Sequence, residues 1–154
     1  MRVLLVQPPF VQLNAPYPAI AYLAAFCRRE GHDARCLDLA IALFHRIFSA
    51  AGLETVFAEA ERRRAELLPG SDAATRANVL RYLSNADRYV RDIDRIVRLL
   101  CVGDEPFANE LAAARRVPWG HRAEGFLEAN DGEIGASDAP LLASLVIEDL
   151  ADFI

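Results

Sequence analysis

The sequence predicts an α/β fold: an N-terminal β-α-β unit with an incomplete sheet, followed by a mostly helical region. Three observations support this prediction. The opening run RVLLVQPPF, at residues 2–10, is apolar and ends in a polar residue and two prolines, as a buried parallel strand does. A helical repeat and a second strand-like run, at residues 33–40, follow it. Beyond residue 40 the apolar residues recur at helical spacing. We therefore expect two regions, residues 1–40 and 41–154.

The first region holds one helix between its two strands. The apolar face of that helix recurs at i, i+3, i+4 and i+7, with Ile20, Leu23, Ala24 and Cys27. Pro18 suits the first helical turn, and Gly31 is the expected stop after Arg28 and Arg29, whose charges favour the last turn. The second strand leads directly into another helix.

The second region reads as a series of helices. Two apolar stripes are separated at Gly52. Residues 66–73 form a turn that contains Ser71, the expected cap of a helix running to about Leu100. Residues 102–136 are interrupted by glycine and proline and look irregular. Ser137 is expected to cap the last helix, whose apolar side is formed by Leu142, Leu145, Val146, Asp149 and Leu150.

The long helix carries a heptad seam, defined by Val79, Leu83, Ala86, Val90, Ile93, Val97 and Leu100. One interpretation is a coiled coil that forms a homodimer through residues 79–100. The other is a helix packed in a bundle, because Tyr82, Tyr89 and Ile96 widen the stripe beyond a narrow seam. The opposite face alternates arginine with aspartate and reads as a solvated, self-paired surface.

Composition excludes several classes of function. The chain has 154 residues, a net charge of −5 and 53% hydrophobic residues, which argues against nucleic acid as a partner. No apolar run approaches the ~20 residues of a membrane span, and no secretory leader is visible, so a cytoplasmic location is expected. All 17 basic residues are arginine, which excludes lysine-based covalent chemistry. The three cysteines suit reduced thiols.

Common catalytic and cofactor motifs are absent. No glycine lies between Pro8 and Glu30, so the first loop cannot be a G-x-G-x-x-G turn or a Walker A cradle. The sequence has no C-x-x-C, H-E-x-x-H or G-x-S-x-G. We therefore predict no metal ligand and no catalytic residue, and whether the chain belongs to an enzyme stays open on these motifs.

Two polar positions near the second strand allow alternatives. Asp38 ends this strand, where it could cap the next helix or bind a ligand hydroxyl. His32 and Cys36 lie close to it in sequence and could form a metal site, but the pattern favours a half-buried strand with an exposed histidine.

The segment LLVQPPFVQLNAPYPAIAYLAAFCRREGHDARCLDLA resembles the N-terminus of cobalamin-binding radical S-adenosylmethionine proteins. The shared features are Gln7-Pro8-Pro9, the loop Pro16–Pro18, Gly31-His32 and a strand ending in Asp38. The segment from Leu145 to Ile154 also matches an L-x-x-E-D-L-A-D-x-I pattern seen in a subgroup.

The resemblance implies a Rossmann-like sheet and cobalamin as the cofactor. It places the cofactor-binding residues on the ligand-facing edge, at Gln7, Pro8, Pro9, Asn14, Tyr17 and Asp38. The prolines could instead merely end the strand and set the helix entry. The family's Cys-x-x-x-Cys-x-x-Cys triad and the Asp-x-His-x-x-Gly motif are both absent. S-adenosylmethionine and a 4Fe-4S cluster would therefore belong to a domain downstream.

The sequence thus predicts the front piece of a longer cobalamin-dependent enzyme, with the remainder of that protein as its partner. The apolar pattern that continues to Ile154 also favours a front piece. The alternatives are a standalone helical module that forms homodimers, and a small-ligand enzyme that uses Asp38 and His32.

Overall fold

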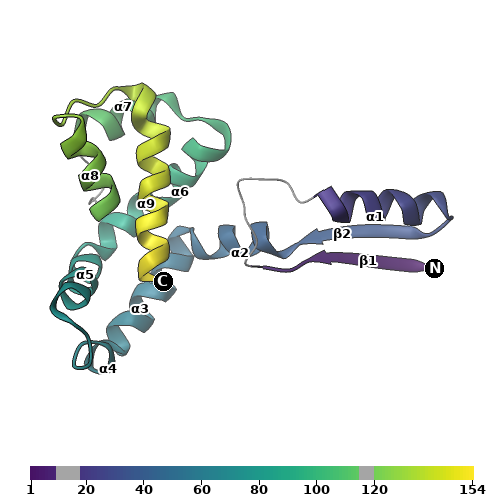
Figure 1. The fold of residues 1–154 in the computed structure, drawn as a ribbon, viewed down its shortest axis with the longest axis horizontal. Coiled ribbons are helices and arrows are strands. Elements are labelled where there is room, and N and C mark those ends of the chain that lie inside the picture. The colour runs from purple at the N-terminus through teal and green to yellow at the C-terminus, as the bar shows by residue number, and fades with distance from the viewer. Residues whose placement is uncertain (10–17, 115–119) are drawn as a thin grey trace. The chain divides into compact units, whose positions relative to one another are not determined.

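The computed structural model describes residues 1–9, 18–114 and 120–154. The chain forms two compact units, Met1–Arg46 (unit 1) and Ile47–Ile154 (unit 2), and each is described by itself. Unit 1 contains a two-stranded parallel sheet, and unit 2 is helical in its described part (Figure 1). The predicted order of a β-α-β unit followed by helices is confirmed.

Unit 1 begins with strand β1 (Arg2–Gln7), helix α1 (Pro18–Arg29) and strand β2 (Asp33–Asp38), and helix α2 (Leu39–Ile47) follows directly. The two strands pair in parallel, in a register that runs from Arg2 opposite Asp33 to Gln7 opposite Asp38. Their carboxyl ends therefore lie side by side, which places the two predicted polar positions next to each other.

The end of α1 has the geometry expected of a glycine stop. Gly31 adopts a φ of 77°, and the His32 N–H donates to the Cys27 carbonyl at 2.9 Å. The Arg28 guanidinium donates two hydrogen bonds to the Ala34 carbonyl, at 2.8 and 3.1 Å. The last turn of α1 is thus fixed near the start of β2, so α1 runs antiparallel to the strands.

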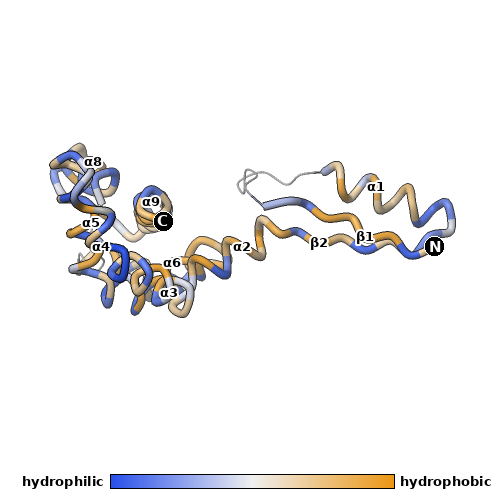
Figure 2. The backbone as a smooth tube through the Cα atoms, turned by 90° about the horizontal axis from the view of Figure 1, so that it is seen from below, coloured by the Kyte–Doolittle hydropathy of each residue, from blue (hydrophilic) through white to orange (hydrophobic). Residues whose placement is uncertain are grey.

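Helix α1 covers one face of the sheet, and within the described part of unit 1 no element covers the other, which we call the open face (Figure 2). The covered side buries only small apolar residues, Ala24 and Ala34, together with Gln7. On the open face, Leu4, Val6 and Leu37 are 60%, 46% and 43% exposed. Parallel sheets are normally buried on both faces, and the described residues of unit 1 cover this sheet on one face.

Unit 2 contains α3 (Ala50–Arg62), α4 (Arg64–Leu67), α5 (Ala73–Ser84), α6 (Ala86–Val102), α7 (Glu105–Ala114), α8 (His121–Ala129), the 3₁₀ turn η1 (Ala136–Asp138) and α9 (Ala139–Phe153). Helices α6 and α9 pack against each other and against several of the others. The large side chains buried between these helices are Leu53, Phe57, Tyr82, Tyr89, Ile93, Ile96, Phe107, Leu111, Leu142, Val146 and Leu150. Unit 2 therefore has the large apolar core that unit 1 lacks.

The predicted long helix is wrong, because the chain breaks at Asn85 between α5 and α6. The Asn85 side-chain amide donates to the Arg81 carbonyl at 2.9 Å, and the Asn85 backbone carbonyl accepts the Arg88 backbone N–H at 3.0 Å. An asparagine side chain competes with the backbone of a helix in this way. Ile93 and Val97 of the heptad seam are buried within unit 2, so the bundle interpretation describes α6, and a homodimer through residues 79–100 stays a prediction.

Several helix starts differ from the prediction. Asp72, rather than Ser71, accepts the Thr75 N–H at 2.9 Å and caps α5. The first break lies at Ser49, which caps α3, and Gly52 lies inside that helix. A 3₁₀ turn at Ser137 precedes α9, which begins at Ala139.

The stretch predicted as irregular contains two helices, α7 and α8. Pro106 lies in the first turn of α7, where a missing N–H costs nothing, and α8 tolerates an interior glycine, Gly125. Gly103 and Gly120 therefore mark helix ends, whereas Gly125 lies inside a helix.

In the described ranges no single helix combines the length and the apolar composition that a membrane crossing requires, and only α2 and α3 taken together, across their break, meet that test.

Candidate functional site

Gln7 and Asp38 form the carboxyl edge of the unit 1 sheet. They lie opposite each other in the strand register, on the face that α1 covers. Gln7 is buried, with only 5% of its surface exposed. Its side-chain amide has no hydrogen-bond partner among the described residues. A buried amide without a partner is costly, because it loses its hydrogen bonds to water. Gln7 is therefore the residue of this edge that most needs a polar ligand.

Asp38 caps the helix that follows it. Its Oδ1 atom accepts the N–H groups of Ala40 and Ile41, at 2.9 and 3.0 Å. The capping interpretation is confirmed, and Asp38 links the strand to α2. Among the described residues no hydrogen bond reaches its second carboxylate oxygen, Oδ2, so the predicted contact with a ligand stays a prediction.

Of the other predicted cofactor-binding residues, the structure describes the two prolines that follow β1. Pro8 is exposed and Pro9 is half-buried, directly after β1. Asn14 and Tyr17 lie outside the described residues. The structure thus brings together Gln7 and Asp38.

His32 and Cys36 do not form a metal cluster with Asp38. The described residues contain no group of three His, Cys, Asp or Glu side chains that could hold a metal ion. The Cys36 thiol lies 3.7 Å from the Ile20 carbonyl, under α1, whereas His32 lies in the turn before the strand. Because side chains alternate along a strand, Cys36 and Asp38 lie on the same face of the sheet. His32 precedes the first residue of β2 that pairs with β1, Asp33.

A second polar cluster lies in unit 2, around Asp149 of α9. This residue is 1% exposed, and its carboxylate accepts the backbone N–H groups of Arg122 and Ala123, at 3.2 and 3.4 Å. The Arg122 guanidinium lies 3.4 Å from the same carboxylate, and the His121 Nδ1 atom lies 3.3 Å from it. We call these residues the Asp149 cluster. Asp149 acts as the N-cap of α8 from a different helix.

Two further residues fit closely around Asp149. The Tyr82 hydroxyl donates to the Asp149 carbonyl at 2.8 Å. A Cβ atom built on Gly120 would lie 2.2 Å from the Asp149 Oδ2 atom, so only glycine fits there. The sequence placed Asp149 on the apolar side of the last helix, and that mismatch was the signal that could have revealed a buried carboxylate. Its donors lie 26 and 27 residues away, and no sequence pattern links them to it.

Tyr82 and Tyr89 stack in the core of unit 2 with Phe57 and Phe153, and the Tyr82 ring lies 4.9 Å from that of Phe153. Burial, together with the smaller effect of the nearby Asp149 charge, raises the pKa of Tyr82 to about 12. Burial also raises the pKa of Tyr89. Both hydroxyls therefore stay protonated well above the pH at which exposed tyrosines ionise.

We expect unit 2 to lose stability as the pH rises from about 10 to about 12. An unfolded tyrosine loses its proton near pH 10, but folded Tyr82 keeps its proton until about pH 12, so high pH favours the unfolded state. This stabilisation is complete below pH 10. Urea unfolding at a series of pH values measures it, and Tyr82→Phe should make the alkaline slope shallower.

Tyr22→Phe is the matched control for the loss of one tyrosine hydroxyl, because Tyr22 is 75% exposed. It should leave the alkaline slope unchanged. An identical slope in Tyr82→Phe and in the unmodified chain would contradict the prediction.

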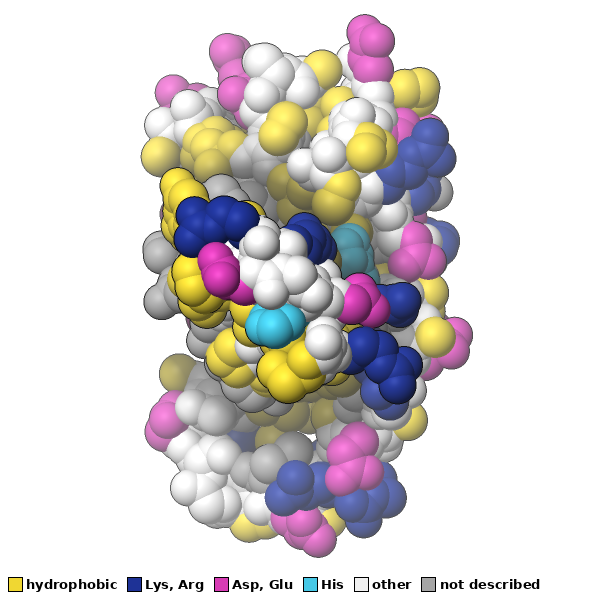
Figure 3. Space-filling model, turned by 90° about the vertical axis from the view of Figure 1, so that its right-hand side faces the viewer, with side chains coloured by type: hydrophobic (Ala, Val, Ile, Leu, Met, Phe, Trp, Pro, Cys, Tyr) yellow, Lys and Arg dark blue, Asp and Glu magenta, His cyan; other side chains and the backbone are white. Residues whose placement is uncertain are grey.

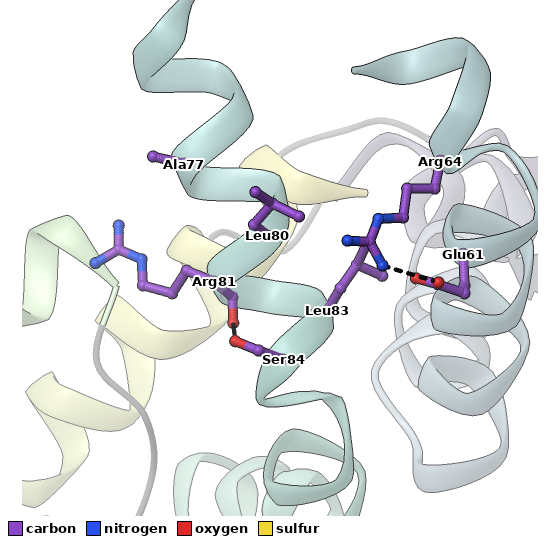
Figure 4. Close-up of a pocket in the computed structure, with 7 residues that line it drawn as sticks. All are labelled: Glu61, Arg64, Ala77, Leu80, Arg81, Leu83 and Ser84. Carbon is purple, nitrogen blue, oxygen red and sulfur yellow. Dashed lines mark hydrogen bonds and ion pairs between the residues drawn. The ribbon is translucent and has the colours of Figure 1, made fainter. Parts of the chain in front are cut away.

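A surface hollow of about 610 Å³ lies between α5 and the segment formed by α3 and α4 (Figure 4). Leu80 and Leu83 supply its apolar part, and at its rim Arg64 pairs with Glu61 at 3.1 Å. Because this rim is already paired, it offers no uncompensated charge to a ligand. The carboxyl edge of unit 1 is therefore the better candidate site.

Comparison of the chain with protein-family models, with curated proteins and with solved structures finds no match in any of the three.

Proposed function

We propose that this chain is the N-terminal segment of a cobalamin-dependent radical S-adenosylmethionine enzyme, and that it supplies part of the cobalamin-binding domain without catalysis of its own. The observation that carries the proposal is the buried Gln7 amide at the carboxyl edge of a parallel β-α-β unit, for which no described residue supplies a hydrogen-bond partner. Ligands of open α/β sheets bind beyond this edge. The ligand is proposed to be cobalamin because the Gln-Pro-Pro turn resembles the turn at this position in cobalamin-binding radical S-adenosylmethionine proteins.

The described residues fit one side of such a site. The Gln7 amide offers both a donor and an acceptor, which suits the amide groups that surround the corrin ring, and Asp38 offers an acceptor beside it. Pro8 and Pro9 would hold the backbone shape of the turn. By resemblance, Asn14 and Tyr17 would complete this edge. When bound, cobalamin would supply the cobalt chemistry of the enzyme.

Two strands supply only a part of a Rossmann-like sheet. Among the described residues of unit 1 no further strand pairs with β1 or β2 and no element covers the second face, so the remainder of the enzyme would complete the sheet and the cofactor pocket. That remainder would also carry the cysteine triad, the 4Fe-4S cluster and the S-adenosylmethionine site. The proposal places the enzyme in the cytoplasm, where exposed thiols such as Cys36 stay reduced.

The coding sequence is the first test. The reading frame downstream of residue 154 should encode further α/β segments and then a Cys-x-x-x-Cys-x-x-Cys motif. A stop codon there, with no gene for such a protein nearby, would overturn the proposal. Titration of the present chain with hydroxocobalamin should show weak binding at most, because one edge of the pocket is present.

Replacing Gln7 with alanine in the complete enzyme should lower its cobalamin content after purification by about tenfold, the effect of losing one or two buried hydrogen bonds. The far-ultraviolet circular dichroism spectrum should not change. Absorbance of bound cobalamin per protein gives the measurement.

Asn109→Ala is the control for loss of an amide, since Asn109 lies on α7 and is exposed. Asp38→Ala should lower the thermal midpoint through the lost helix cap, an effect of ~1 kcal/mol. If the cobalamin content of Gln7→Ala is unchanged, Gln7 does not bind the cofactor and the Gln-Pro-Pro turn has only a structural role.

A further inference from the structure

The break between α5 and α6 involves a single residue, Asn85. In an uninterrupted helix the backbone N–H of Asn85 would donate to the Arg81 carbonyl. In the structure the Asn85 Nδ2 atom donates to that carbonyl instead, and the backbone N–H donates to the Tyr82 carbonyl at 3.2 Å. The backbone angles of Asn85, φ −114° and ψ 11°, each differ by about 50° from those of an α-helix. A modest rotation at this residue would therefore join α5 and α6 into one helix.

The sequence on both sides of the break favours a continuous helix. The heptad seam runs through it, and its residues nearest the break, at steps of four, three and four, are Val79, Leu83, Ala86 and Val90. These four residues are half-buried in unit 2, whereas Ile93 of the same seam lies in the core. The described residues of unit 2 thus cover the seam only in part where it passes Asn85.

Helix α5 borders two surface hollows. The hollow of about 610 Å³ lies between α5 and the α3–α4 segment (Figure 4), and one of about 660 Å³ is lined by α5 residues and by His121 at the start of α8. Within α5, Tyr82 is the residue that is buried, and its hydroxyl donates to the Asp149 carbonyl. Straightening at Asn85 would withdraw Tyr82 from this place, so a single chain would lose the main anchor of α5.

A second copy of the chain can restore this anchor. The hydrogen bond from Tyr82 to Asp149 joins elements on opposite sides of Asn85, and so does the stacking of Phe57 on Tyr89, with ring centroids 6.1 Å apart. Contacts of this kind can form equally well between two copies that exchange the elements before the break. On the face of the molecule seen in Figure 3, basic and acidic side chains lie among hydrophobic ones, so that face offers no surface of one charge to a different partner.

We propose that unit 2 forms a domain-swapped dimer, in which α5 and α6 join into one helix and α3–α5 of each copy pack on α6–α9 of the other. The Tyr82 hydroxyl of one copy then donates to the Asp149 carbonyl of the second copy. The contacts across the break in the monomer are kept in the dimer, because each is made once with the other copy.

The dimer gains contacts that the monomer does not have. The two long helices pass each other in antiparallel directions where the monomer has its break. Because the four seam residues are spaced symmetrically, Val79 of one copy lies opposite Val90 of the other, and Leu83 lies opposite Ala86. The half-buried part of the seam is thereby covered by its own copy in the second chain.

Replacing Asn85 with alanine should favour the dimer. Alanine removes the side chain that takes the place of the backbone N–H, and it is favoured inside a helix. Asn85→Gly is the matched control, since it removes the same side chain but disfavours a continuous helix. After refolding from urea, the dissociation constant of the dimer should be about tenfold lower for Asn85→Ala than for Asn85→Gly. Sedimentation equilibrium gives the measurement.

Isotope labelling distinguishes a swapped dimer from one that pairs through its surface. Chains with ¹³C-labelled phenylalanine are mixed with unlabelled chains in urea and refolded together. In the swapped dimer, isotope-filtered nuclear Overhauser spectra should connect Tyr82 of one copy with Phe153 of the other, because these rings lie 4.9 Å apart. A surface-paired dimer keeps this contact within each chain. Val79→Thr, added to Asn85→Ala, should weaken the dimer because it places a hydroxyl in the covered seam.

Three results would overturn the swapped dimer. They are an Asn85→Ala chain that stays monomeric at every concentration, equal dimerisation of Asn85→Ala and Asn85→Gly, and a dimer without the signal between Tyr82 and Phe153 of different copies. If Asn85→Ala does not fold, the unmodified chain refolded at high concentration should contain the swapped dimer, and its absence there would also overturn the proposal. These experiments use no cobalamin, so their outcome is independent of the proposed function.

Discussion

Replacing Asp149 with alanine should lower the free energy of unfolding of unit 2 by about 2–4 kcal/mol. The buried carboxylate accepts two backbone N–H groups at the start of α8 and faces the Arg122 guanidinium. Alanine leaves those N–H groups without an acceptor in a buried place. It also removes the acid that compensates Arg122 on that side. Urea unfolding followed by circular dichroism measures the loss.

The variants Asp149→Asn and Asp152→Ala separate the causes. Asparagine keeps one oxygen that can accept an N–H but loses the charge, so its stability should fall between those of the unmodified chain and Asp149→Ala. Asp152 contacts Arg122 from an exposed position on the same helix, and its removal should change stability by less than about 0.5 kcal/mol. Equal effects of Asp149→Ala and Asp152→Ala would contradict the role of Asp149 as the cap of α8.

Replacing Gly120 with alanine should destabilise unit 2 by an amount similar to the loss of Asp149, about 2–4 kcal/mol. The new Cβ atom would lie 2.2 Å from the Asp149 Oδ2 atom and 2.5 Å from its Cβ atom, which is closer than atoms can approach. The backbone angles of Gly120, φ −81° and ψ −178°, suit any residue, so the effect comes from the contact and not from backbone strain. Thermal unfolding gives the measurement.

Gly125→Ala is the matched control, because both glycines belong to the same helix region and no atom lies within 4 Å of a Cβ atom at Gly125. Alanine inside a helix is favoured over glycine, so this variant should gain roughly 0.5–1 kcal/mol. In the double variant Gly120→Ala and Asp149→Ala, the two losses should add only in part, because alanine removes the clashing carboxylate but keeps the Cβ atom of residue 149, 2.5 Å from the new one. Full additivity would show that the contact with the carboxylate contributes nothing to the effect of Gly120→Ala.

Local sequence signals determined the N-terminal unit. A short apolar run ending at Gln7, a helical repeat, a glycine stop at Gly31 and a capping Asp38 each act over a few residues. Such signals depend on backbone geometry and on hydrogen bonds between residues close in sequence, so they can be recognised in the sequence without knowledge of the rest of the fold. The candidate edge at Gln7 and Asp38 was therefore predicted, because parallel strands bring their carboxyl ends together.

The helical unit shows where such signals end. The heptad repeat was continuous in sequence, but the Asn85 side chain bonds to the preceding turn and breaks the helix. Asp92 was expected on a solvated face, yet it is fully buried, with the Arg91 guanidinium 2.7 Å from its carboxylate. Whether the helix continues through Asn85 or ends there depends on how the segments before and after it pack in the tertiary structure.

By itself, then, the sequence determined the order of the elements, the parallel β-α-β unit and the polar residues at its carboxyl edge. Only the tertiary structure decided that Gln7 is buried without a described partner, that no described element of unit 1 covers the opposite face of the sheet, and that Asp149 caps a helix to which it does not belong. The physical reason is that burial and long-range hydrogen bonds depend on which surfaces meet, whereas strand and helix patterns depend on neighbours along the chain.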